Sequence, residues 1–247
     1  MIQAMIFDLD GTLVQTERLK ALSYAKAVAE LCPHEVSEAQ VVEAFKEVVG
    51  LSRREVAQLL VERFNLEEKA KARSAEFVVS SAWQAFIQVR LQYYESMLAD
   101  PQILLDHRWP HNLALLEEAR RANCKTGLAT MSRCRQVQRV LKILSLENAF
   151  DFIASRDDVN QGKPDPEIYR LVASELHLPA TDCLVIEDSP SGVQSALAAG
   201  MWCIAMTTPF TRQAIHAKGL LDERWIVDDP EDLPSVVKEM IEARTET

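Results

Sequence analysis

The sequence predicts an α/β fold in which a doubly wound parallel sheet carries an inserted all-α helical domain. A short apolar run near the N-terminus ends in two aspartates, and residues 17 to about 98 form long helical segments with few chain breakers. After residue 100, short apolar runs alternate with amphipathic helices, which is typical of parallel strands joined by helices. We therefore expect one domain from residues 1–16 and 99–247, and a second from residues 17–98.

The first expected strand, residues 4–7, leads into the sequence Asp8-Leu9-Asp10-Gly11-Thr12. Residues two apart in an extended chain point to the same side, so Asp8 and Asp10 can serve one site if strand geometry continues through Leu9. One carboxylate could then attack a substrate while the other moves protons. The alternative is an aspartate-rich turn that merely ends a strand.

The inserted domain should be helical because Gly50 is the only glycine between Gly11 and Gly127. Helices are expected over residues 17–31, 37–48, 53–64 and 67–98, with a break allowed in the last. The sequence Asp100-Pro101 marks the return to the first domain.

The C-terminal part should complete a Rossmann-like core. Strands are expected at residues 125–129, 151–154, 182–186, 202–206 and 224–227. Two intervening segments show apolar residues at helical spacing, which are Val137, Val140, Leu141 and Leu144 in one and Leu233, Val236, Val237, Met240 and Ile241 in the other.

Composition narrows the classes of function. A chain of 247 residues with 48% hydrophobic content can bury a sizeable core, and a net charge of −10 argues against nucleic-acid or membrane-surface binding. The five cysteines are scattered without metal-ligand spacing, which suits a reducing cytoplasm. Because the first expected strand begins almost at Met1, we expect no secretory leader, and no run reaches transmembrane length.

Polar groups are expected to gather at one edge of the sheet. Asp8, Thr130 and the pair Glu187-Asp188 each follow an expected strand, and ligands of such sheets bind at the carboxyl ends of the strands. Lys163 lies in a loop on the same side, before a helix that we expect to begin with Asp165 as N-cap and Pro166 at its first position. Taken singly, each residue has a structural explanation as a cap, a strand end or a solvated side chain.

Carboxylates crowded in this way repel one another unless a hard cation lies among them, and Mg²⁺ prefers oxygen ligands. A lysine and a hydroxyl beside such an ion suit phosphoryl transfer, in which catalysis is mainly positioning and charge neutralisation. A carboxylate can be the nucleophile of that reaction.

These residues resemble the four ordered motifs of the haloacid dehalogenase-like hydrolase superfamily, and the helical insertion resembles the α-helical cap of its β-phosphoglucomutase and sugar-phosphate phosphatase subgroup. The resemblance implies that Asp8 is the nucleophile and Asp10 the general acid/base. It implies that Asp8, Asp10 through its backbone carbonyl, Asp188 and, directly or through water, Glu187 hold Mg²⁺. It assigns the transferring phosphoryl group to Thr130 and Lys163.

Some positions separate subgroups within this superfamily. Members resembling dehalogenases lack the second aspartate, which is present here as Asp10. Members resembling phosphonoacetaldehyde hydrolase use a cap lysine as a Schiff base, whereas position 53 is arginine. Mutase-like members carry a histidine where this chain has Lys20, which argues against mutase activity.

Further substrate contacts are expected around these motifs. The sequence Gly50-Leu51-Ser52-Arg53 resembles the cap specificity loop of β-phosphoglucomutase, so Arg53 is a candidate for binding a second anionic group. A helix N-terminus capped by Ser52, with solvated arginines, explains the same residues equally well. Lys20 is a second cap candidate, and Ser132 can extend the phosphate site.

We expect a Mg²⁺-dependent phosphatase that acts on a small phosphorylated metabolite, a sugar phosphate, through an aspartyl-phosphate. One alternative is a β-phosphoglucomutase-like phosphosugar mutase, and a less favoured one is a non-catalytic metabolite-binding protein. We expect a monomer or weak homodimer.

Overall fold

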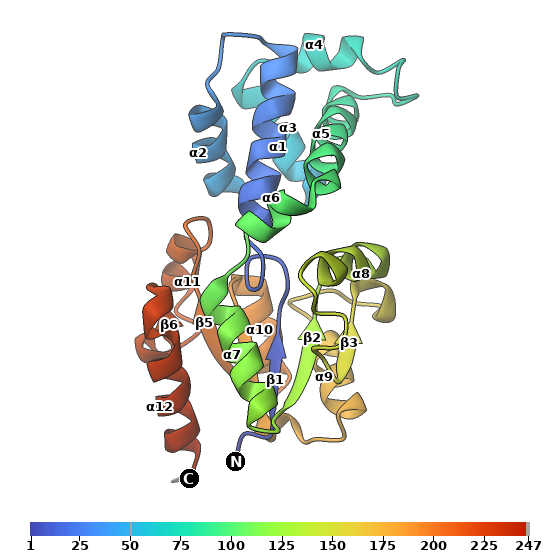
Figure 1. Cartoon of the computed structure of the whole chain (residues 1–247). Coiled ribbons are helices and arrows are strands. Elements are labelled where there is room, and N and C mark those ends of the chain that lie inside the picture. The colour runs from blue at the N-terminus through green and yellow to red at the C-terminus, as the bar shows by residue number, and fades with distance from the viewer. Residues whose placement is uncertain (50, 246–247) are drawn as a thin grey trace. The chain divides into compact units, whose positions relative to one another are not determined.

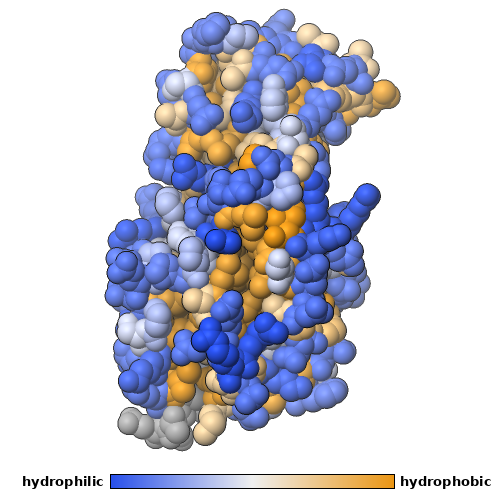
Figure 2. All heavy atoms as spheres, in the orientation of Figure 1, coloured by the Kyte–Doolittle hydropathy of each residue, from blue (hydrophilic) through white to orange (hydrophobic). Residues whose placement is uncertain are grey.

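The computed structural model describes residues 1–49 and 51–245. It divides into two compact units, one formed by Met1–Gln15 with Leu104–Thr247 and the other by Thr16–Ile103 (Figure 1). Hydrophilic residues predominate on the face shown in Figure 2, as expected for a chain with 26% charged residues. No helix among the described residues is long and apolar enough to cross a membrane.

The larger unit is built on a six-stranded parallel sheet with the order β3-β2-β1-β4-β5-β6. The chain starts in the middle at β1, moves outward to β3, and then returns to the other side of β1 with β4. This reversal makes the sheet doubly wound and confirms the predicted fold class. The strands are β1 (Ala4–Phe7), β2 (Lys125–Ala129), β3 (Phe152–Ala154), β4 (Cys183–Glu187), β5 (Trp202–Met206) and β6 (Ile226–Val227).

Helices cover both faces of this sheet, so β1 and β4 are buried along their whole length. Figure 1 shows α7 and α12 in front of the sheet and α10 behind it. Ile6 and Val185 pack with α9 and α10 in one hydrophobic cluster, which also contains Tyr169. The helices are α7 (Pro110–Arg121), α8 (Cys134–Ile143), α9 (Glu167–Glu175), α10 (Pro190–Ala198), α11 (Arg212–Lys218) and α12 (Leu233–Thr245).

The smaller unit is all-helical, as the few chain breakers in this stretch predict. Its centre is Tyr24, whose ring lies 5.6 Å from that of Phe45 and 5.7 Å from that of Phe86. The helices are α1 (Thr16–Leu31), α2 (Glu38–Val48), α3 (Arg53–Arg63), α4 (Glu67–Ala72) and α5 (Ala82–Ala99). The chain boundary of the two units falls within α6 (Pro101–Asp106).

Several element boundaries differ from the prediction. The break that the prediction allowed within residues 67–98 lies between Ala72 and Ala82, and Ser81 forms a capping box with Gln84 that starts α5. The strand expected at 224–227 is shortened to two residues, because Glu223–Trp225 forms a 3-10 turn.

The start of α9 is shifted by one residue. Pro166 is the N-cap and the helix begins at Glu167. Asp165, expected as the N-cap, still accepts a hydrogen bond from the Glu167 backbone N–H at 2.9 Å, so its carboxylate serves the first turn from one position further out.

Candidate active site

The central strand carries Asp8 to the carboxyl edge of the sheet. Phe7 pairs with Leu128 of β2 and with Ile186 of β4, so the residues that follow these strands meet at one place. The Asp8 backbone N–H continues the ladder by donating to the Ile186 carbonyl at 3.1 Å, and the Asp8 residue is only 5% exposed. The nucleophile candidate is thus held by the sheet itself.

Beyond Asp8 the chain bends at Leu9, so the condition that strand geometry continues through Leu9 is not met. Gly11 adopts φ +95°, a conformation that favours glycine. A Cβ atom at Gly11 would lie 2.1 Å from the Asp188 Oδ2 atom. The glycine therefore lets the turn after β1 approach the carboxylate that follows β4.

Lys163 links two of the carboxylates. Its Nζ atom donates to Asp8 Oδ1 at 2.7 Å, to Glu187 Oε1 at 2.6 Å and to the Ala129 carbonyl at 2.9 Å. The three donors of the ammonium thus have three acceptors. Burial alone would lower the pKa of Lys163, but the charges of Asp8 and Glu187 outweigh it and raise that pKa above its usual range.

The pKa values of Asp8 and Glu187 shift in opposite directions. Burial, opposed by the Lys163 charge but reinforced by Glu187 and Asp10, raises the pKa of Asp8 to about 8. Burial also acts on Glu187, but the charge and hydrogen bond of Lys163 outweigh it and lower the pKa of Glu187. One ammonium therefore does not balance the negative charge next to Asp8.

A divalent cation fits this imbalance. Ligand oxygens of Asp8, Glu187 and Asp188 lie within 4.8 Å of one another, and all three residues are buried. A set of carboxylate oxygens is typical of hard cations. The Asp10 carboxylate is outside this group, so a role for Asp10 in metal binding depends on its backbone carbonyl.

Asp10 instead faces the hydroxyls that follow β2. Its Oδ2 atom accepts from Ser132 Oγ at 2.5 Å and from Thr130 Oγ1 at 3.3 Å. The Thr130 hydroxyl in turn accepts from the Ser132 backbone N–H at 3.0 Å. Two of the three predicted phosphate-binding residues, Thr130 and Ser132, are thus in direct contact with the predicted acid/base.

The predicted substrate residues of the smaller unit lie on separate helices. Lys20 of α1 forms an ion pair with Glu17 at 2.8 Å. Arg53 is exposed at the start of α3, where Ser52 and Glu55 form the capping box expected for a helix N-terminus. Gly50, which begins the predicted specificity loop, lies outside the described residues.

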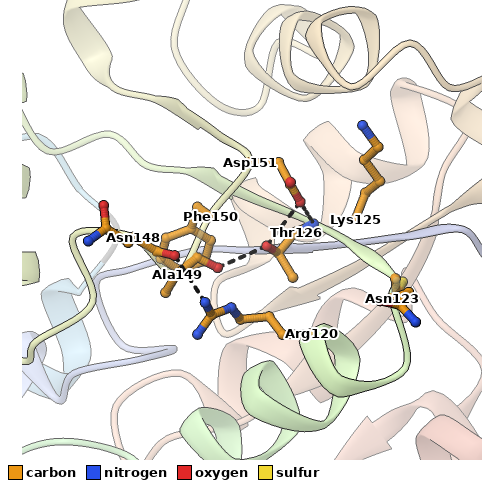
Figure 3. Close-up of a pocket in the computed structure, with 9 residues that line it drawn as sticks. Arg120, Asn123, Lys125, Thr126, Asn148, Ala149, Phe150 and Asp151 are labelled. Carbon is orange, nitrogen blue, oxygen red and sulfur yellow. Dashed lines mark hydrogen bonds between the residues drawn. The ribbon is translucent and has the colours of Figure 1, made fainter.

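A polar groove lies at the opposite edge of the sheet. It has a volume of about 280 Å³ and is lined by the end of α7 and by the residues that lead into β2 and β3, including Arg120, Lys125 and Asp151 (Figure 3). The Asp151 carboxylate is already bound to Thr126, and none of the predicted site residues lines the groove.

Comparison with known proteins identifies the family of the chain. The family model described as haloacid dehalogenase-like hydrolase matches residues 5–206. The chain belongs to this family. It is 29% identical to a phosphorylated carbohydrates phosphatase from Thermotoga maritima, over 97% of this chain and all of that protein. It is 25% identical to a validoxylamine A 7'-phosphate phosphatase from Streptomyces hygroscopicus subsp. limoneus, over 91% and 97% of the two chains.

Solved structures share the fold. The putative β-phosphoglucomutase from Thermotoga maritima superposes with a TM-score of 0.71, covering 96% of this chain and 99% of that one at 24% identity. In this chain the fold brings the four predicted motifs to one edge of the sheet. Asp8, Lys163 and Glu187 are in direct contact there.

Tyr169 and Ser189 also contact the site, although the sequence did not indicate a role for them there. The Tyr169 hydroxyl donates to Glu187 Oε1 at 3.0 Å, and the Ser189 backbone and hydroxyl both donate to Glu187 Oε2. Ser189 was recognisable as a helix cap, which it also is, since it accepts from the Gly192 N–H. Tyr169 gave no signal, because it occupies an ordinary apolar position of an amphipathic helix.

Proposed function

We propose that this chain is a Mg²⁺-dependent phosphatase that hydrolyses a small phosphorylated metabolite, a sugar phosphate, through an aspartyl-phosphate on Asp8. The observation that carries the proposal is the buried contact of the Lys163 ammonium with Asp8 and Glu187, beside Asp188 and within reach of the Asp10 charge. Phosphatases among the relatives support the class of substrate.

In the proposed reaction an Asp8 oxygen attacks phosphorus, and the bond from phosphorus to the leaving oxygen breaks. Asp10 gives its proton to that oxygen. Asp10 then takes a proton from water as the water oxygen attacks phosphorus. The bond to Asp8 breaks and inorganic phosphate leaves, so both residues return to their starting states.

The remaining groups would bind and neutralise charge. Thr130, Ser132 and Lys163 would hold the transferring phosphoryl oxygens. Asp8, Asp188, the Asp10 backbone carbonyl and Glu187, directly or through water, would hold Mg²⁺. When bound, the ion supplies positive charge that offsets repulsion between the carboxylates and the phosphoryl group.

The larger unit would be the catalytic core, predicted as residues 1–16 and 99–247, and the smaller unit would be the cap, predicted as residues 17–98. Arg53 and Lys20 are proposed to contact the rest of the substrate. A small metabolite, rather than nucleic acid or a membrane, fits the net charge of −10. We further propose a monomer or weak homodimer in the cytoplasm, where free cysteines such as those of this chain persist.

A phosphate-release screen over sugar phosphates, nucleotides and phosphoglycolate, with and without Mg²⁺, tests the proposal. We expect turnover of at least one sugar phosphate that depends on Mg²⁺ and is abolished in Asp8→Asn. Identification of the sugar product separates hydrolysis from isomerisation, because a mutase returns the phosphoryl group to another hydroxyl. Wild-type rates from a cleanly purified Asp8→Asn protein would exclude the mechanism.

A further inference from the structure

Tyr169 is a fully buried residue of α9 that none of the sequence motifs includes. Its hydroxyl donates to Glu187 Oε1 at 3.0 Å. Its ring lies under the Lys163 ammonium, with Nζ 4.9 Å from the ring centroid. One side chain thus contacts both members of the Lys163–Glu187 ion pair, through two different kinds of interaction.

Both oxygens of the Glu187 carboxylate accept hydrogen bonds. Its Oε1 atom accepts from Lys163 and Tyr169. Its Oε2 atom accepts from the backbone of Asp188 and from the backbone and hydroxyl of Ser189. These five donors reach the carboxylate from α9, the Lys163 loop and the start of α10, and together they hold it in one orientation.

The orientation of Glu187 in turn places Lys163. The ammonium is 2.6 Å from Glu187 and 2.7 Å from Asp8, so a rotation of the Glu187 carboxylate would draw the ammonium away from Asp8 or leave it short of one acceptor. The Tyr169 ring bounds the ammonium on a further side. Both contacts favour a single position of Lys163.

We propose that Tyr169 is a positioning residue that, through Glu187 and through its ring, holds the Lys163 ammonium against Asp8 for phosphoryl transfer. The proposal rests on the proposed function for its role in the reaction. The competing explanation is packing alone, because Tyr169 also belongs to the apolar cluster that contains Ile168 and Val172. A phenylalanine would fill that space equally well, so the hydroxyl is the discriminating group.

The test is Tyr169→Phe, which keeps the ring and removes the hydroxyl. The matched control is Tyr93→Phe, since the Tyr93 hydroxyl also donates to a glutamate, Glu30, at 2.7 Å but within the smaller unit. We expect kcat/KM on the substrate found by the screen to fall about ten-fold or more in Tyr169→Phe, as for outer groups that orient a site. In Tyr93→Phe, kcat/KM should stay within two-fold of the wild-type value, because the exposed Tyr93–Glu30 contact contributes little.

A second readout does not depend on activity. The ammonium signal of Lys163 in ¹⁵N-lysine NMR spectra, assigned by its loss in Lys163→Gln, should shift and exchange faster in Tyr169→Phe but not in Tyr93→Phe. Combining Tyr169→Phe with Glu187→Gln tests the route, because the effect of the tyrosine change on this signal should largely disappear once Glu187 is neutral.

The outcomes separate the two proposals. No phosphate release by wild type from any compound would refute the proposed function, and the NMR comparison would still decide whether Tyr169 positions Lys163. An unchanged Lys163 signal in a folded Tyr169→Phe protein, with wild-type kcat/KM where turnover exists, would show that Tyr169 only packs the core. Equal effects of Tyr169→Phe with and without Glu187→Gln would exclude action through Glu187.

Discussion

Negative charges outnumber positive charges around Asp8, and this excess governs the pKa values of the site residues. The Lys163 ammonium faces two carboxylates directly, and Asp10 adds a further negative charge near Asp8. Because the site is buried, neither the ammonium nor the carboxylates are stabilised by bulk water. Each group is therefore stable in its charged form only while its partners remain.

Lys163→Met tests this dependence, because it removes the ammonium and keeps a long side chain. We expect the free energy of unfolding to fall by about 3 kcal/mol and phosphatase activity to be lost, since Asp8 and Glu187 would keep their burial without a counter-charge. Urea denaturation at neutral pH without Mg²⁺ measures the first effect. Lys125→Met is the control, because Lys125 is exposed on β2, and equal stability of the two variants would contradict this account.

His216 offers a separate test of local electrostatics, away from the proposed metal site. Hydrogen bonds and charges of Asp228 and Glu223 raise the pKa of His216 above 6.5. Because the folded-state pKa is raised, protonated His216 stabilises the fold fully below the unfolded value of about 6.5. That contribution is lost as the pH rises through the folded-state pKa.

NMR titration of the His216 imidazole should therefore give a pKa above 6.5 in wild type and a lower pKa in Asp228→Asn. The pKa should fall because the substitution removes the negative charge of Asp228, whose Oδ2 atom lies 3.1 Å from His216 Nε2. A His216 pKa that is the same in both proteins would rule out the contact.

At the scale of elements, the start of α10 and the end of β4 are fitted to each other. A Cβ atom at Gly192 would lie 1.7 Å from Glu187 Oε1, so the first turn of α10 can pack against the carboxylate only with glycine there. The same turn presents the Ser189 and Asp188 donors to Glu187. The helix N-terminus thus forms part of the site.

Gly192→Ala should consequently displace either Glu187 or the first turn of α10. We expect a loss of about 2 kcal/mol in the free energy of unfolding, in the range of overpacked buried positions, together with a fall in kcat. Ser191→Ala, at the adjacent exposed position, should leave both near wild-type values. Thermal or urea unfolding and steady-state kinetics check this, and a fully active, stable Gly192→Ala protein would show that the fit is loose.

Element type was more predictable than element boundaries, for physical reasons. Apolar spacing identifies helices such as α8, whose Val137, Val140 and Leu141 are buried as expected. The break between Ala72 and Ala82 depends on tertiary packing and on the Ser81–Gln84 capping box. The turn that ends β1 similarly depends on the contact of Gly11 with Asp188, which no local pattern reveals.

At the scale of the whole molecule, sheet topology explains why much of the site was predictable. Parallel strands all end at one edge, so residues at or just beyond the ends of β1, β2 and β4 must be neighbours once the strand order is known. Asp8, Thr130 and Glu187 could therefore be grouped from sequence alone. Tyr169 could not, because its contact with Glu187 depends on how α9 packs against the sheet.

The hydrogen bond from Ser132 to Asp10 was equally hidden, although both residues were predicted to belong to the site. It depends on the conformation of the loop after β2, and loop conformations are fixed by many weak contacts rather than by a periodic pattern. Strand ends are thus predictable, whereas the side-chain partners that orient them require the structure.

The most direct measurement is mass analysis of the acid-quenched enzyme during turnover of its sugar phosphate with Mg²⁺. The mechanism predicts a protein carrying one extra phosphoryl group, located by peptide mapping to the segment with Asp8, and no such species in Asp8→Asn. Turnover with no phosphoryl group on the enzyme, in an assay shown to retain a known aspartyl-phosphate, or a phosphoryl group on another residue, would contradict the central role of Asp8.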